Sequence, residues 1–311
     1  MVLFRHLSTS IALKSPKAQE ANYENRLKSS SSKYSKTPDT PLQRAIAFKP
    51  LHDKAYSHKF GSVQKNTYRL SETFSKAVMK PYQKIPILEC GEPLVPIPLD
   101  KFAVESPHPY EKLGAPYGEA SPYYLRESVL AALIAAQAQL QQQYPGWRIQ
   151  VFDAYRPVAV QQFMVDHTFA EVIRARQLNP DTLSNQERDA ILQDVYTLWA
   201  VPSPNPLTPP PHSTGAAIDI TLVDATGEPI DMGSAIDELS DRSHPDYYAN
   251  QPEKPYHMHR QLLRDVMYSA GFRRHPGEWW HFCLGDQMWA WLCNQENSEV
   301  SVTARYGRIA T

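Results

Sequence analysis

The 311-residue sequence lacks the features that mark several large classes of protein. It has no apolar run of about 18 residues, the length that a membrane-spanning helix requires, and therefore predicts no membrane span. Its three cysteines, Cys90, Cys283 and Cys293, are scattered, which excludes a disulfide framework and a cysteine-based zinc knot. The GxSxG motif of serine hydrolases, the glycine-rich nucleotide fingerprints and internal repeats are also missing.

The sequence also predicts no export signal. The opening residues, MVLFRHLSTSIALKS, have neither a continuous apolar core nor an obvious small-residue cleavage site. Scattered thiols without a pairing pattern are typical of a reducing compartment. The sequence therefore predicts a cytoplasmic protein rather than a periplasmic one.

Charge is unevenly distributed, although the net charge is only −1. Residues 1–79 carry 14 Lys and Arg against 5 Asp and Glu, whereas the remainder carries 18 against 28. The first segment is also rich in Ser and Lys, which predicts a disordered basic extension. Attachment to an anionic surface is the functional alternative. Its basic and aromatic residues follow no nucleic-acid-binding pattern, so no nucleic-acid partner is expected.

The remaining sequence predicts a domain over residues 80–293 and a tail over 294–311. A capping box, Ser184 with Glu187, marks one helix start, and Pro157 is expected at the first position of another helix. Helices are predicted over 121–146, 156–177, 184–200 and 256–272, and strands over 147–155, 216–224 and 277–284. A few mainly antiparallel strands flanked by helices indicate a small α+β fold.

Polar residues interrupt two of the predicted strands. His212 and Asp219 lie in HSTGAAID, and His281 lies in GEWWHF. Two imidazoles and one carboxylate are the ligands of a catalytic zinc site, which keeps a fourth position for water. Because His212 and Asp219 are seven positions apart, a straight strand would point them to opposite faces, and Gly215 is expected to supply a bend.

Two further residues fit peptide hydrolysis at such a site. Glu278, three residues before His281, is the candidate general base, and the spacing predicts a bulge or turn within GEWWHF, with Trp279 and Trp280 walling the pocket. Arg156, in DAYRP, is the candidate for stabilising the oxyanion, held by a bidentate pair with Asp153. A structural salt bridge is the alternative role for that arginine.

Four motifs in this order, DAYRP, HSTGAAID, MGSAIDELSDRSH and EWWHF, resemble the bacterial zinc D-alanyl-D-alanine dipeptidases of the vancomycin-resistance type. The resemblance spans residues from about 85 to 290. It implies an α+β domain shared with D,D-carboxypeptidases and the hedgehog signalling domain. It also implies one zinc ion per chain and hydrolysis of the dipeptide D-Ala-D-Ala to two D-alanines by a metal-activated water.

The same resemblance implies roles for individual residues. Zinc would bind His212, Asp219 and His281, with Glu278 as base and Arg156 steadying the tetrahedral intermediate. Asp237 would help to hold the amino group of the dipeptide, together with either Tyr110 or Tyr117. The family usually has serine two residues before the first ligand, where this chain has Pro210, and Ser213 is the candidate substitute.

Alternatives remain at this stage. A D,D-carboxypeptidase acting on longer cell-wall peptides would have an open groove, and a non-catalytic metal-binding module of the hedgehog type would have no need of Glu278 or Arg156. His257 and His259 form a second possible metal pair, although their place at a predicted helix start favours a surface role. The oligomeric state is left open.

Overall fold

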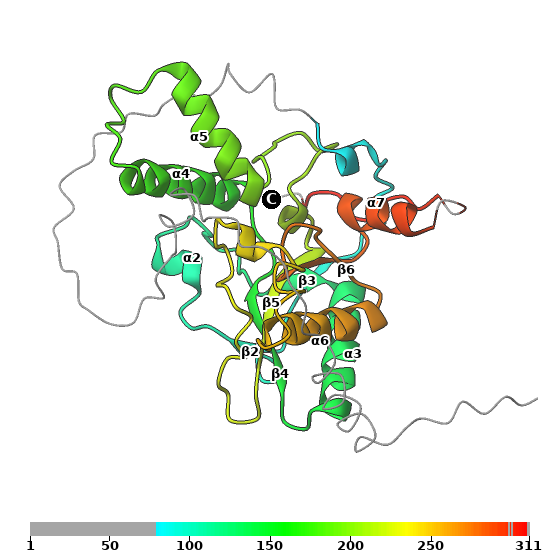
Figure 1. The fold of residues 1–311 in the computed structure, drawn as a ribbon. Coiled ribbons are helices and arrows are strands. Elements are labelled where there is room, and N and C mark those ends of the chain that lie inside the picture. The colour runs from blue at the N-terminus through cyan, green and yellow to red at the C-terminus, as the bar shows by residue number, and fades with distance from the viewer. Residues whose placement is uncertain (1–78, 298, 300, 310–311) are drawn as a thin grey trace, which may run out of the picture. The chain divides into compact units, whose positions relative to one another are not determined.

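A five-stranded sheet forms the centre of the computed structural model, which describes residues 79–297, 299 and 301–309 (Figure 1). The predicted extension, residues 1–79, lies outside the described residues except for Met79. The strands are β2 (Ala103–Val104), β4 (Arg148–Asp153), β5 (Ala217–Val223), β7 (His281–Cys283) and β6 (Arg273–Arg274), in that spatial order. The β2–β4 pair is parallel and the other three pairs are antiparallel, so the predicted mainly antiparallel α+β fold is confirmed.

Helices cover both faces of this sheet. They are α2 (Pro109–Lys112), α3 (Glu127–Gln143), α4 (Val158–Ala175), α5 (Asn185–Leu198), α6 (Tyr256–Ser269) and α7 (Gln287–Glu296), with 3-10 turns η3 (Pro81–Lys84), η4 (Pro211–Thr214) and η5 (Asp241–Ser243). The predicted capping box starts α5, because the Ser184 hydroxyl accepts from the Glu187 amide and the Glu187 carboxylate accepts from the Ser184 amide. None of the described helices is both long and apolar enough to span a membrane.

Two helix starts differ from the prediction. The helix expected from residue 121 begins at Glu127, because Tyr124–Arg126 form β3 and pair with β1 (Leu94–Pro96). The Arg126 side chain explains the preference, since its buried guanidinium donates to the carbonyl oxygens of Thr214 and Gly307. Pro157 is the cap residue before α4 rather than its first helical residue.

Alternation along β5 separates the apolar core from the polar site. Ile218, Ile220 and Leu222 point into the core shared with α3 and α6. Asp219 points to the opposite face, beyond which α4 and α5 lie (Figure 1). Asp219 is paired with Asp153 of β4 and with His281 of β7, so the register sets three polar residues in a row across adjacent strands.

The described part of the predicted tail, 294–311, packs against the chain that precedes β1. The boundary predicted at residue 293 falls inside α7. Beyond that helix, the Leu88 amide donates to the Ala304 carbonyl oxygen at 2.8 Å, and Tyr306 is only 1% exposed. This segment therefore belongs to the same packed structure as the sheet.

Candidate metal centre

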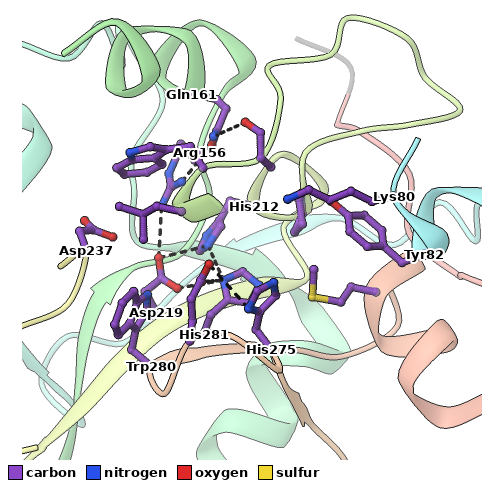
Figure 2. Close-up of a pocket in the computed structure, with 16 residues that line it drawn as sticks. Lys80, Tyr82, Arg156, Gln161, His212, Asp219, Asp237, His275, Trp280 and His281 are labelled. Atoms are coloured by element: carbon purple, nitrogen blue, oxygen red, sulfur yellow. Dashed lines mark hydrogen bonds and ion pairs between the residues drawn. The ribbon is translucent and has the colours of Figure 1, made fainter. Parts of the chain in front are cut away.

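Three buried side chains converge at the polar face of the sheet, as Figure 2 shows. Nε2 of His212 lies 3.1 Å from Nδ1 of His281 and 3.2 Å from Oδ2 of Asp219. Nδ1 of His281 lies 3.0 Å from Oδ1 of Asp219. Ligand bonds of about 2.0–2.1 Å in a tetrahedral arrangement separate the ligand atoms by about 3.3 Å. The measured contacts, which involve both oxygens of Asp219, are close to that separation, and one ligand atom from each residue lies within 4.8 Å of the other two.

The backbone reasons for this convergence are the strand register and one bend. Asp219 and His281 are direct partners in the β5–β7 pair, while His212 lies on the turn η4 just before β5. Gly215 ends that turn with a φ of 70°, and a Cβ there would lie 2.3 Å from a methyl carbon of Leu94. Both facts favour glycine, so the bend predicted at this position is present.

A hydrogen bond outside the triangle fixes which nitrogen of His212 faces its centre. Nδ1 of His212 donates to the Ala154 carbonyl oxygen at 2.7 Å, so the proton is on Nδ1 and Nε2 carries the lone pair. On His281, Nδ1 is the nitrogen that faces the other two side chains, while Nε2 is buried without a hydrogen-bond partner among the described residues. Burial raises the pKa of Asp219, but His212 and His281 outweigh it and hold that pKa well below its ordinary value. Two imidazoles and one carboxylate are a donor set that suits a divalent cation.

Glu278 lies beside this triangle, on the turn that leads into β7. Its carboxylate oxygens are 3.9 Å from Nδ1 of His281 and 3.6 Å from Nδ1 of His275. β7 begins only at His281, so the turn predicted within GEWWHF is present. Burial, followed by the negative charges of Asp219 and Asp237, raises the pKa of Glu278 well above its ordinary value. A carboxyl group in this environment is suited to accepting and returning a proton.

The guanidinium of Arg156 is fixed on every side. Its Nε and Nη2 both contact one oxygen of Asp153, at 2.9 and 2.8 Å, so the predicted pairing holds but is not bidentate across two oxygens. Nη2 also donates to Asp219 at 3.2 Å, and Nη1 donates to Gln161 at 2.9 Å. The cation lies 4.9 Å from the centre of the Trp199 ring. Such a side chain presents its charge with little freedom to move.

The hydroxyl groups of the two candidate tyrosines donate to different aspartates. The Tyr110 hydroxyl donates to Asp237 at 2.7 Å and accepts from Arg156, whereas the Tyr117 hydroxyl donates to Asp153, behind the arginine. Asp237 has a φ of 60°, and burial together with Asp219 raises its pKa to about 7. Tyr110 is therefore the tyrosine that shares a hydrogen bond with Asp237.

Ser213 is not brought into the cavity. Its buried hydroxyl donates to the Pro210 carbonyl oxygen at 2.7 Å within η4, and the serine is absent from the cavity lining. The two tryptophans also differ, since Trp280 lines the cavity while the indole nitrogen of Trp279 donates to Ser234. Only one of the two predicted tryptophans therefore walls the pocket.

The loop that carries Asp237 is held by a residue that the sequence reasoning passed over. Arg260 of α6 is fully buried and donates to the carbonyl oxygens of Met232, His244 and Arg242. These bonds tie the loop to the helix. The preceding histidines, His257 and His259, take no part in the triangle, and within the described chain no second metal-ligand cluster is present.

A cavity that is partly open to solvent contains the triangle, Glu278 and Asp237. Its walls also include residues that the sequence reasoning missed, namely Lys80, Tyr82, Gln161, Leu198, Trp199 and Met288. Gln161 left a trace in the sequence, because it and Thr168 are the two polar residues on the mostly apolar buried face of α4. Lys80 left none, since a single lysine near the basic N-terminal segment is unremarkable by pattern.

Comparison with known proteins gives consistent matches. Residues 104–303 match the family described as D-ala-D-ala dipeptidase. A D-alanyl-D-alanine dipeptidase from Synechocystis sp. is 53% identical over 240 residues, 74% of this chain and 97% of that protein. Another from Enterococcus faecium is 32% identical, over 53% of this chain and 73% of its own length. Among solved structures, the LD-carboxypeptidase LdcB matches with a TM-score of 0.36 and 17% identity, over 70% of this chain and 76% of that one.

Proposed function

This chain belongs to the D-ala-D-ala dipeptidase family of peptidases, and from that premise we propose that it hydrolyses D-Ala-D-Ala to two D-alanines with one bound zinc ion. The family predicted from the four sequence motifs is thus confirmed. The observation that supports the chemistry is the triangle of His212, Asp219 and His281, with Glu278 and Arg156 at its border inside one cavity.

The donor set supports zinc in particular. Nitrogen and oxygen ligands from two histidines and one aspartate, with a position left open, are typical of catalytic zinc sites. When bound, such an ion would polarise the scissile carbonyl and lower the pKa of the attacking water. The carbonyl oxygen of Ala154 would fix the first histidine ring, as partners outside the ligand set commonly do.

Glu278 is proposed as the group that moves the proton. Its carboxylate would take a proton from the attacking water and pass it to the nitrogen of the departing D-alanine. Its oxygen 3.9 Å from His281 places it within reach of a small molecule at the border of the triangle. Trp280, which lines the same cavity, would exclude competing water from this exchange.

Arg156 and Asp237 are proposed to bind opposite charges of the reacting dipeptide. The fixed guanidinium of Arg156 would stabilise the negative charge that develops on the carbonyl oxygen. Asp237, which carries the hydrogen bond from Tyr110, would receive the positively charged amino group. Burial and Asp219 raise the pKa of Asp237 to about 7, which disfavours its ionised form. The ammonium group of the dipeptide would stabilise that ionised form.

The proposal is tested by measuring amino-acid release from three substrates. We expect the zinc-loaded protein to cleave D-Ala-D-Ala, and to be much less active on the L,L isomer and on a pentapeptide that ends in D-Ala-D-Ala. A chelator should abolish release and added zinc should restore it. Preferential cleavage of the pentapeptide would instead identify a carboxypeptidase, and no cleavage of any substrate would remove the enzymatic proposal.

Replacing Arg156 by lysine should lower kcat about a hundredfold and leave the bound zinc in place. Lysine keeps one positive charge but loses the planar array of donors that contacts Asp153, Asp219 and Gln161. Steady-state kinetics and elemental analysis measure the two effects. Arg174→Lys, on the exposed side of α4, is the control and should change neither. Loss of zinc in the Arg156 variant would show a structural role instead.

A further inference from the structure

We propose that Lys80 is a specificity-determining residue that binds the free carboxylate of the dipeptide. This inference rests on the proposed function, because it assigns the second charged end of the same substrate. A dipeptide at neutral pH is a zwitterion, with an ammonium group on its first residue and a carboxylate on its second. The family match covers residues 104–303, so this lysine lies outside the matched segment.

The position of Lys80 in the cavity supports this role. Figure 2 shows Lys80 on one side of the triangle and Asp237 on the other, with His212 between them. Both residues line the same cavity. An anion-binding and a cation-binding side chain therefore flank the place where the peptide bond would be cleaved. This polarity matches a molecule whose two ends carry opposite charges.

The ammonium group of Lys80 has bonding capacity to spare. Its Nζ donates to the Tyr196 carbonyl oxygen at 3.3 Å, and among the described residues it forms no ion pair. An ammonium group has three donors, so two are available for a ligand. Burial lowers the pKa of Lys80, while the negative charge of Glu278 opposes that change. A partly buried cation without a paired anion gains when an anionic ligand arrives.

The backbone around Lys80 is fixed rather than loosely attached. The Lys80 amide donates to the side chain of Gln83 at 2.8 Å, and the Gln83 amide donates back to the Lys80 carbonyl oxygen at 3.0 Å. The next turn is held by Gln287 of α7, whose side chain donates to the Ile85 carbonyl oxygen at 2.7 Å. Tyr82, between them, is buried. The lysine is therefore presented by an ordered segment, as a built binding site requires.

The experiment compares D-Ala-D-Ala with D-Ala-D-alaninamide, which lacks the negative charge, in the full-length zinc-loaded protein. In Lys80→Met, kcat/KM for the acid should fall about 10- to 100-fold, mainly through KM, because a charge-assisted hydrogen bond is lost. For the amide the same variant should change little. Where amide cleavage is too slow to follow, its inhibition constant against D-Ala-D-Ala is measured instead.

Controls separate charge recognition from structural damage. Lys80→Arg keeps the positive charge and should retain most of the preference for the acid. Lys84→Met removes an exposed lysine of the same turn and should leave kcat/KM unchanged for both the acid and the amide. Thermal melting and zinc content identify a misfolded variant, in which case Lys80→Gln takes the place of Lys80→Met.

The outcomes separate the Lys80 assignment from the proposed dipeptidase activity. Equal losses on acid and amide would overturn the assignment of Lys80 as the group that binds the carboxylate. A wild-type protein without preference for the acid would overturn it as well. A zinc-loaded wild type that cleaves no dipeptide would overturn the proposed function, and this inference with it. An acid-specific loss that arginine restores would support the inference.

Discussion

Glu278→Gln is expected to reduce turnover of D-Ala-D-Ala by about three orders of magnitude while the bound zinc stays in place. Glutamine has nearly the same shape as glutamate but cannot accept a proton from water. Glu278 lies outside the triangle, with its nearest oxygen 3.9 Å from Nδ1 of His281, so its loss should not remove a ligand. Steady-state kinetics and elemental analysis of the same preparation measure both quantities.

A matched surface variant controls for the loss of one carboxylate. Glu253→Gln, in the exposed segment before α6, should retain wild-type turnover and zinc. Near-normal turnover in Glu278→Gln would remove that residue as the base. A joint loss of zinc and turnover would show that the carboxylate supports the metal rather than the proton transfer. The two results are distinguishable because metal content is measured separately from the rate.

Short-range sequence patterns were enough to predict which residues of the strands point into the candidate site. Asp219 interrupts an apolar strand, and His281 follows a turn, so both stand out as polar residues in sequence of low polarity. A glycine three residues after His212 predicted the bend, and its left-handed φ of 70° is the conformation that favours glycine. The triangle of His212, Asp219 and His281 could be anticipated because each of these residues lies in or beside a strand or turn that the local sequence predicts.

Long-range contacts explain what could not be predicted. The strands β1, β2 and β6 have only two or three residues, so their pairing depends on distant partners rather than on periodicity. Helix α3 begins at Glu127 rather than at residue 121, because the Arg126 side chain donates to carbonyl oxygens far along the chain, at Thr214 and Gly307. Lys80 reaches the cavity only because its turn is held against α7, a contact with no sequence signature.

Tyr110 and Tyr117 illustrate the same limit at a single site. Both are aromatic residues near the start of the domain, and the resemblance alone did not choose between them. Burial also fails to separate them, at 2% and 6% exposure. Only the direction of each hydroxyl does so, toward Asp237 for the first and toward Asp153 for the second. Side-chain direction of this kind depends on how α2 and its following loop pack on the sheet.

His212→Ala is expected to lose both zinc and activity, with turnover reduced by at least about a thousandfold. The variant removes one corner of the triangle, so the Ala154 carbonyl oxygen loses its histidine partner and Asp219 keeps only His281. Two remaining ligands bind a divalent ion much more weakly than three. Elemental analysis after dialysis measures the metal, and thermal melting with and without added zinc measures its contribution to stability.

His259→Ala is the matched control for that variant, because this partly buried histidine of α6 makes its hydrogen bond to the Asp231 carbonyl oxygen, away from the triangle. It should keep zinc, turnover and the zinc-dependent rise in melting temperature. In His212→Ala that rise should disappear, since a ligand stabilises the folded state only to the extent that the folded state binds it. Retention of one zinc per chain by His212→Ala, with its melting temperature still raised by the metal, would mean that the ion binds elsewhere.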